Sequence, residues 1–381
     1  MNIPELLEGK RVCVCAGAGG VGKTTTSAVV GLGMAAQGLR VAVVTIDPAR
    51  RLANALGLEE LENRPRQVSP ERLRAHGLDV KGELWAMMLD PKRTFDELIE
   101  RLASTPQRAE EIKANRVYRE LSTAVSGSQE FTAVSKLYEL TQENDFDLLV
   151  LDTPPSRSAL DFFDAPGRLT SFLEGRALKA FVRPTGLGIR VLGAGAAPLL
   201  GGLRRITGID LIADLTTFFG LLGDMTENFT ARAREVERLL HAPETAFLLV
   251  TSAQREPIDE GIWFRRTLRS SGLPFAGVVV NRFHHDLGES LGSGEMRDGL
   301  SELLPEALAE QVAENWWDYH VLASRDQANV ERLAGELEGE PLLLVPQLDD
   351  DVHDVNGLVR VHRYLFASDA ERARLIEDVV A

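Results

Sequence analysis

Short apolar runs alternate with longer segments of helical pattern along this chain. Such runs, separated by helical stretches, are typical of a parallel sheet that is covered by helices on both faces. The sequence therefore predicts an α/β fold with a mostly parallel sheet flanked by helices. The expected strands are Arg11–Cys15, Val41–Ile46, Leu84–Leu89, Leu148–Leu151, Phe247–Thr251, Ala276–Val280 and Leu342–Val345.

Polar residues follow several of these strands. Asp47, Asp152, Gln254 and Asn281 stand at or just beyond their carboxyl ends. In open α/β sheets, ligands bind beyond the carboxyl ends of the strands. We therefore expect these side chains to lie at the edge of a ligand site.

Residues 17–25 read Gly-Ala-Gly-Gly-Val-Gly-Lys-Thr-Thr, between the first expected strand and a helix expected over Thr24–Gln37, which Gly38 closes. The spacing fits the phosphate-binding motif G-x4-G-K-[ST]. Glycines let the backbone curl until consecutive N–H groups point at one anion, and the helix N-terminus adds its dipole. The sequence therefore predicts a P-loop NTPase fold. The expected nucleotide contacts are Gly17, Gly19, Gly20, Val21, Gly22, Lys23, Thr24 and Thr25.

Three side chains of this loop have distinct expected roles. Lys23 is expected to reach the β- and γ-phosphates, and Thr24 to hold Mg²⁺ through its hydroxyl. Thr25 is expected near the α-phosphate. ATP and Mg²⁺ are the predicted cofactors.

Composition limits the kinds of binding partner and the cellular compartment expected for this protein. The chain has 381 residues, a formal net charge of −15 and two cysteines, Cys13 and Cys15. The negative charge argues against a nucleic-acid partner. Two cysteines on one face of a strand make no disulfide framework or cysteine metal site, and we expect them to be buried. Met1–Gly9 lacks the apolar stretch of a signal peptide, so we expect a cytoplasmic protein, with peripheral membrane contact left open.

Further motifs follow the P-loop in a fixed order. Asp47-Pro48-Ala49, Asp90-Pro91 and Asp152-Thr153-Pro154-Pro155 each follow a strand, and Asn281 and Val345-Pro346 come later. Over nearly the whole chain, these motifs resemble the family of deviant Walker A ATPases that includes the arsenite-efflux pump ATPase and the tail-anchored-protein targeting ATPase. In that family D-P-A marks the first switch and D-T-x-P the second.

The resemblance implies a role for each motif. Asp47, in the first switch, would orient the attacking water, and Asp152 would assist Mg²⁺ through a coordinated water. Asn281 would contact the adenine, and Pro346 lies in the loop that closes over the base. Gln254 falls where the family can carry a nucleotide-contacting acidic residue from the partner subunit.

Position 18 departs from the family, because the family has a lysine there that reaches across a dimer to the neighbour's phosphates. This chain has Ala18. A methyl group stabilises no charge on the transferred phosphoryl group. Three interpretations stay open: a heterodimer with a lysine-bearing homologue, replacement of the lysine by Arg50 or Arg51, or tight ATP binding with poor hydrolysis. The expected assembly is a homo- or heterodimer.

Three segments are expected from the motifs. Residues 1–156 form the first part of the nucleotide-binding core, including a helical segment over 92–144. Residues 157–243 form a helical insertion after the second switch, and residues 244–381 complete the core. Within the insertion, Gly186–Gly202 is rich in glycine, alanine and leucine with few charges. The stretch Val191–Leu203 is uncharged but too short to span a bilayer.

An amphipathic stripe over residues 211–229 allows two interpretations. Its apolar members, such as Leu211, Phe218, Met225 and Phe229, recur with helical period. The stripe either packs on its own core or forms the wall of a groove that nucleotide opens and closes. In the tail-anchored targeting relatives, the equivalent region holds an apolar helix of a membrane-protein client.

Several other features have local interpretations. His284-His285 is expected in a solvated loop, Asp349–Asp351 as a turn that caps the next helix, and Asn356–Ala381 as a docked helix. Trp316-Trp317 is either a packing anchor or an interface. The insertion has no cysteine, which argues against metalloid export by thiol binding.

Two functions follow. One is an ATPase whose hydrolysis opens and closes a dimer that acts on a membrane-associated client or partner. The other is a weakly active nucleotide-binding regulatory subunit of a heteromeric complex. Arsenite or anion export is a third, less favoured hypothesis.

Overall fold

The structure is a computed structural model that describes residues 1–47, 49–116, 118–119, 128–143, 145–154, 217, 220–221, 225–285 and 292–380. The chain forms two compact units. The first comprises Met1–Met88, Phe146–Arg157 and Pro243–Ala381, and the second comprises Leu89–Asp145 and Ser158–Ala242. The helical segment over 92–144 therefore belongs to the second unit, whereas the sequence division placed it with the nucleotide-binding core.

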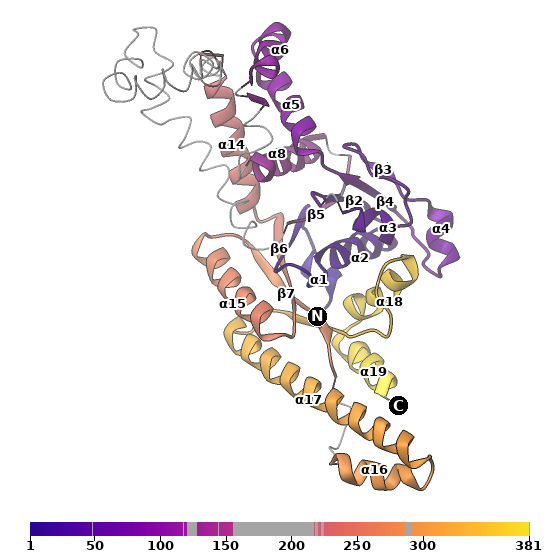
Figure 1. Ribbon diagram of the computed structural model, residues 1–381. Coiled ribbons are helices and arrows are strands. Elements are labelled where there is room, and N and C mark those ends of the chain that lie inside the picture. The colour runs from indigo at the N-terminus through magenta and orange to yellow at the C-terminus, as the bar shows by residue number, and fades with distance from the viewer. Residues whose placement is uncertain are drawn as a thin grey trace, which may run out of the picture. The chain divides into compact units, whose positions relative to one another are not determined.

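The first unit is built on one eight-stranded sheet in the order β3-β4-β2-β5-β1-β6-β7-β8 (Figure 1). All strand pairs are parallel except β3 with β4. This confirms the predicted α/β class with a mostly parallel sheet. The strands are β1 Val12–Ala16, β2 Arg40–Thr45, β3 Arg66–Gln67, β4 Glu83–Met88, β5 Leu148–Asp152, β6 Thr245–Ser252, β7 Phe275–Phe283 and β8 Leu342–Pro346.

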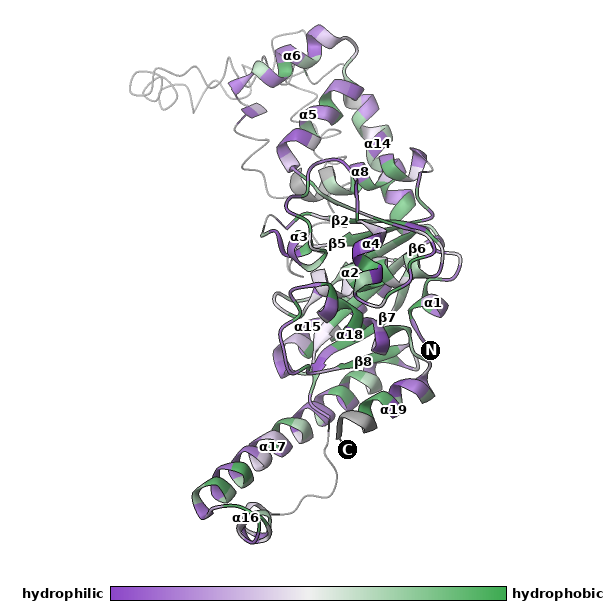
Figure 2. Ribbon diagram, turned by 90° about the vertical axis from the view of Figure 1, so that its right-hand side faces the viewer, coloured by the Kyte–Doolittle hydropathy of each residue, from purple (hydrophilic) through white to green (hydrophobic). Residues whose placement is uncertain are grey.

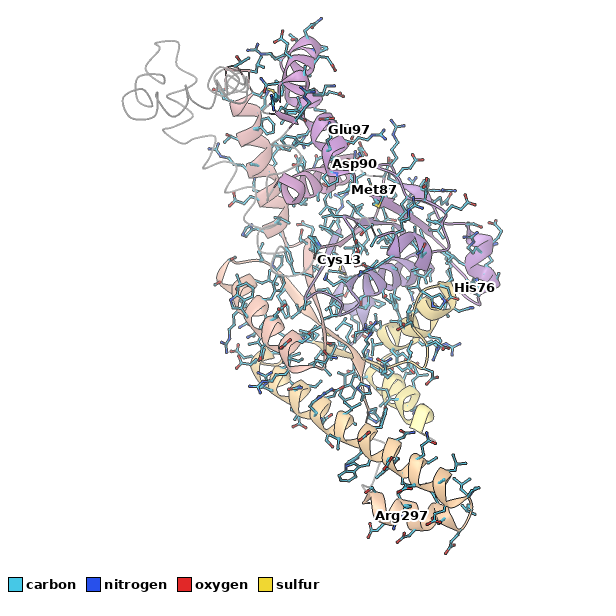
Figure 3. All side chains as sticks on the ribbon, viewed as in Figure 1. Cys13, His76, Met87, Asp90, Glu97 and Arg297 are labelled. Carbon is cyan, nitrogen blue, oxygen red and sulfur yellow. The ribbon has the colours of Figure 1, made fainter. Side chains whose placement is uncertain are left out.

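The burial of the strands explains why the sequence predicts seven of them and misses β3. Every residue of β1, β5 and β6 is buried, as expected for strands covered on both faces. Cys13 and Cys15 are among them, and Figure 3 shows Cys13 within the sheet. The expectation that both cysteines are buried is confirmed. The unpredicted strand β3 has only two residues, both exposed, and so carries no apolar signal.

The register of the sheet aligns the strand ends that form the site. Asp152 pairs with Cys15 on one side and with Thr45 on the other. Thr45 in turn pairs with Met88. The carboxyl ends of β1, β5, β2 and β4 therefore meet at the same edge of the sheet.

Helix α2, Lys23–Ala36, packs on the centre of this sheet, against β2, β5 and β4. It begins one residue before the expected helix and ends one residue before the expected end, and Gly38 follows with φ 107°. The other helices of the unit are α1 Ile3–Leu6, α3 Arg51–Ala55, α4 Pro70–Ala75, α15 Arg255–Ser270, α16 Ser293–Ser301, α17 Glu306–Leu337, α18 Val355–Phe366 and α19 Asp369–Val380.

Two local expectations near the C-terminus are wrong. The expected single helix over Asn356–Ala381 is two helices, because Ala367 adopts an extended backbone with ψ 148°. Ser368 then starts α19: its Oγ accepts the Glu371 N–H, and the Glu371 carboxylate accepts the Ser368 N–H. The aspartates at 349–351 do not cap α18. Asp354 does, since its Oδ1 accepts the Gly357 N–H at 2.9 Å.

The second unit is helical in its described part. Its helices are α5 Pro91–Leu102, α6 Pro106–Ala114, α8 Ser128–Glu143 and α14 Thr226–His241. Asp90 caps α5 by accepting the Arg93 N–H. Met225 and Phe229 are buried against α5 and α6 residues in one apolar core, so these two members of the stripe belong to a core. The other apolar members of the stripe and residues 186–203 lie outside the described residues.

None of the described helices combines the length and the apolar character that crossing a bilayer requires.

Candidate functional site

The P-loop lies directly against β6. A Cβ atom on Gly17 would lie 1.9 Å from the carbonyl oxygen of Val250, so only glycine fits there. Gly20 and Gly22 have φ values of 78° and 96°, which side-chain-bearing residues rarely adopt. A Cβ atom on Gly22 would also lie 2.3 Å from the Asn281 side chain. The loop sequence is therefore dictated by close packing as well as by backbone curvature.

Lys23 points back into this loop. Its Nζ donates to the carbonyl oxygen of Ala18 at 2.7 Å, and the side chain is buried. Burial lowers the pKa of Lys23, while the nearby carboxylates of Asp152 and Asp47 act in the opposite direction. Within the described part of the chain, the Lys23 ammonium group hydrogen-bonds only to this backbone carbonyl. It can therefore exchange that bond for one to an anion.

Asp152, at the end of β5, is the most buried carboxylate of the site. Its Oδ2 accepts hydrogen bonds from the hydroxyls of Thr24 at 2.7 Å and Thr45 at 2.9 Å. Among the described residues, its Oδ1 is buried with no hydrogen-bond partner. Burial raises the pKa of Asp152 to about 6, against the two threonine hydrogen bonds, which lower it. A buried carboxylate oxygen without a partner is costly, so this atom points to a missing ligand.

These residues fit Mg²⁺. The ion prefers oxygen ligands and is bound in proteins by one or two carboxylates together with substrate phosphates and water. Oδ1 of Asp152 and the hydroxyl of Thr24, which donates to Oδ2 of the same carboxylate, offer such oxygens. In the part of the chain that the structure describes, no group of three or more acidic, histidine or cysteine side chains forms a metal cage. The donor set therefore suits an ion brought with a phosphate ligand.

Asp47 lies at the end of β2, two residues after Thr45. Its N–H donates to the Thr45 hydroxyl at 3.1 Å, and its Oδ1 accepts the N–H of Ala49 at 2.9 Å. The side chain is 32% exposed, so it remains accessible to water. Pro48 lies outside the described residues. Thr45 therefore contacts both Asp47 and Asp152, a role that the sequence analysis missed.

The two arginines after the first switch point to different partners. Arg50 has φ 55° and donates to Glu60 at 2.7 Å. Arg51 begins α3, and its Nε lies 3.8 Å from Oδ2 of Asp47. A cavity beside Asp47 is lined by Arg50 and Glu60 but not by Arg51. The structure therefore distinguishes two residues that are equivalent in the sequence.

The expected nucleotide contacts beyond the P-loop have different surroundings. Asn281 is buried, and its Nδ2 donates to the carbonyl oxygen of Val21 at 3.0 Å, so it contacts the P-loop itself. Pro346 is buried at the end of β8, where it pairs with Phe283. Gln254 is exposed and precedes α15. The contacts of Asn281 and Pro346 with a base stay predictions.

The histidine pair follows β7 in irregular backbone, and His284 has a partner inside the fold. The backbone N–H of His284 and its ring Nδ1 both lie within hydrogen-bond distance of Oδ2 of Asp326, at 3.2 and 2.7 Å. Asp326 is buried on α17. The expectation of a solvated side chain is therefore wrong for His284, whose partner lies 42 residues away on α17.

Comparisons with known proteins agree with the family that the P-loop and the strand-end motifs resemble. The model of the family described as anion-transporting ATPase matches residues 10–325. A protein of Aquifex aeolicus (strain VF5), named as an arsenical pump-driving ATPase, is 22% identical over 364 residues, which cover 94% of this chain and 79% of that protein. ATPase get3 of Schizosaccharomyces pombe (strain 972 / ATCC 24843) is 24% identical over 307 residues, 80% of this chain and 82% of that protein. ATPase GET3 of Mycosarcoma maydis is 27% identical over 267 residues, 70% of each chain.

Proposed function

Because this chain belongs to the anion-transporting ATPase family, we propose that it binds ATP with Mg²⁺ at the P-loop and hydrolyses it. The observation that carries the proposal is the arrangement around Asp152. Its Oδ2 is held by Thr24 and Thr45, while its buried Oδ1 lacks a partner among the described residues. This arrangement is suited to a cation at the end of a phosphate chain.

The roles of the other residues follow from their positions. The backbone N–H groups of the P-loop bind the phosphates, and Lys23 exchanges the Ala18 carbonyl for a phosphate oxygen. When bound, Mg²⁺ neutralises charge on the phosphates. Asp47 is accessible and held by Thr45 and Ala49, so it can accept a hydrogen bond from the attacking water and orient it. Asn281 fixes the loop through Val21.

We propose that Arg51 supplies the positive charge that the family's lysine would provide at position 18. Arg50 is already held by Glu60, whereas Arg51 lies next to the carboxylate that orients water. An arginine supplied within the same chain can stabilise the charge that develops on a transferred phosphoryl group. Arg51 would exchange its weak, exposed ion pair with Asp47 for the phosphate, at little cost in stability.

The wider function is proposed from the relatives. Their names describe arsenical pump-driving and GET3-type ATPases. We infer a cytoplasmic dimer that opens and closes with the ATP cycle and acts on a membrane-associated client or partner. The alternative is a weakly active regulatory subunit that pairs with a lysine-bearing homologue, which Ala18 supports.

The test is the Mg²⁺-dependent ATP turnover of the purified chain beside Lys23→Ala and Asp47→Asn, with the oligomeric state measured at each concentration. Turnover that both substitutions abolish supports an independent ATPase. If wild type binds ATP without turnover, the regulatory-subunit proposal takes its place. If wild type does not bind ATP at all, both proposals fail.

A further inference from the structure

Helix α16 and the first half of α17 form an arm, defined here as residues 293–321, that extends away from the sheet of the first unit (Figures 1 and 2). Figure 3 shows Arg297 on α16 at the far end of this arm. Within the arm, α17 packs against α16, and Ala309 and Ala313 are its buried residues. Farther along, α17 packs on α15 and β7. The second half of α17 thus belongs to the body of the unit, and the arm projects from it.

The arm carries most of the exposed apolar side chains in the described part of the chain. Seven large apolar residues are exposed there, and five of them lie on the arm: Leu303, Leu308, Val312, Trp317 and Val321. Trp317 and Val321 are 41% and 49% exposed and stand four residues apart, so they are neighbours on the surface of α17. Exposed aromatic and aliphatic neighbours of this kind are typical of a protein interaction surface.

The same part of α17 carries a row of acidic residues. Glu306, Glu310, Glu314 and Asp318 follow one another at intervals of four residues. Between residues 293 and 321 there are seven acidic residues and one arginine, Arg297, which pairs with Asp298. In the described structure none of the four forms an ion pair. Like charges at this spacing destabilise a helix, and no ion pair within the described ranges of the chain offsets this cost.

The acidic row and the two apolar residues share one face. Trp317 lies three residues after Glu314 and seven after Glu310, and Val321 lies three residues after Asp318. Residues at intervals of three, four and seven lie on the same side of an α-helix. Leu308 and Val312 do not fit these intervals and lie on the opposite side of α17. We call the face formed by Glu306, Glu310, Glu314, Trp317, Asp318 and Val321 the acidic face.

We propose that the acidic face binds a basic amphipathic helix of a partner protein. Apolar side chains of such a helix would cover Trp317 and Val321, and its lysines and arginines would meet the acidic row. An arginine can also stack on the exposed indole of Trp317. A second copy of this chain would bring the same negative charge, and nucleic acids and anionic membranes carry that charge as well. The negative charge of the acidic face therefore favours a basic partner helix over these three alternatives. This inference does not depend on ATP hydrolysis.

The experiment uses the full chain and synthetic helical peptides of about five turns, with leucines on one face and flanking arginines. Two control peptides replace the arginines by glutamates or the leucines by serines. Binding is measured by fluorescence anisotropy for wild type, for Glu310→Lys with Glu314→Lys, and for Trp317→Ser with Val321→Ser. The matched controls are Asp349→Lys with Asp350→Lys, and Leu308→Ser with Val312→Ser. Circular dichroism and ATP binding confirm that each variant is folded.

We expect the arginine–leucine peptide to bind wild type, both control peptides to bind at least about tenfold more weakly, and each acidic-face variant to lose about tenfold in affinity. The matched controls should bind like wild type, and added salt should weaken binding. Equal losses in the matched controls would overturn the proposal, as would the absence of saturable binding. Sedimentation that shows self-association abolished by Trp317→Ser would instead assign the face to a second copy. Binding to anionic vesicles with the same dependence would assign it to a membrane.

Discussion

The Thr45 hydroxyl donates a hydrogen bond to Oδ2 of Asp152 at 2.9 Å, although the two residues lie 107 positions apart in the chain. The oxygen of the same hydroxyl accepts the N–H of Asp47 at 3.1 Å. One side chain therefore joins the carboxylate proposed to assist the metal and the backbone N–H of the residue whose carboxylate is proposed to orient water. A movement of either aspartate that breaks its bond to Thr45 leaves the Thr45 side chain held only by its bond to the other.

Replacing Thr45 by valine tests this link. Valine keeps the shape but leaves the Asp47 N–H without an acceptor and Asp152 with one donor fewer. Because an unpaired buried polar group costs about 1–3 kcal/mol, we expect Thr45→Val to lower ATP turnover at least about tenfold. Thr45→Ser keeps the hydroxyl and should retain most of the activity. Turnover numbers and ATP affinities of both variants decide the matter, and a fully active valine variant would show that the link is dispensable.

Asp152 also predicts a pH dependence of stability. Burial raises its pKa to about 6 from an ordinary value of 3.8. Between about pH 4 and pH 6 the folded chain therefore retains a proton that the unfolded chain releases, so the free energy of unfolding falls as the pH rises through this window. Above it, the buried carboxylate costs up to about 3 kcal/mol. We expect nucleotide-free Asp152→Asn to be more stable than wild type at pH 7.5 by up to this amount, and by about half as much at pH 5.

Denaturant unfolding of both proteins at the two pH values measures this difference. Mg²⁺ with nucleotide should stabilise wild type, because ligands that bind only the folded state raise its stability. The asparagine variant should lose most of that Mg²⁺ effect while it still binds nucleotide. If the variant is less stable than wild type at both pH values, the Oδ1 atom is satisfied in solution and the argument for a cation site at Asp152 fails.

The comparison of sequence and structure shows which features were predictable. The P-loop and the aspartates at the strand ends follow from local patterns of apolar runs and glycine spacing, and each occupies a short continuous segment. The role of Thr45 and the contact of His284 with Asp326 depend on sheet register and on a helix 42 residues away. No local pattern carries that information. Arg50 and Arg51 are adjacent and chemically identical, so only three-dimensional contacts separate them.

Gly17 and Gly20 form a matched pair for the P-loop. A Cβ atom on Gly17 would lie 1.9 Å from the backbone of Val250, whereas a Cβ atom on Gly20 would meet nothing within 4 Å. We expect Gly17→Ala to destabilise the protein by about 3 kcal/mol, because overpacking against backbone cannot relax by a rotamer change. Gly20→Ala has only the left-handed backbone to oppose it and should cost about 1 kcal/mol. Denaturant unfolding compares the two, and equal losses would show that the loop moves away from β6 to make room.

The two arginines of the first switch give the sharpest test of how this chain manages without a lysine at position 18. Arg51→Gln removes a cation 3.8 Å from the Asp47 carboxylate, whereas Arg50→Gln removes one that Glu60 already neutralises. Loss of a group that stabilises charge only in the transition state typically reduces turnover about 100-fold or more. We expect this loss in Arg51→Gln with ATP affinity nearly unchanged, and turnover within about twofold of wild type in Arg50→Gln.

Lysine at position 51 separates charge from shape in the same experiment. Arg51→Lys keeps the positive charge without the planar fork of the guanidinium group, so its turnover should lie between those of wild type and Arg51→Gln. If Arg51 only stabilises α3, the lysine and glutamine variants should lose stability equally. Their turnover should then fall in proportion to their stability. If wild type hydrolyses ATP and Arg51→Gln does so equally well, Arg51 is not the missing cation. Restoring the family's lysine by Ala18→Lys in the Arg51→Gln background then asks whether a cation that crosses the dimer can replace one supplied within the chain.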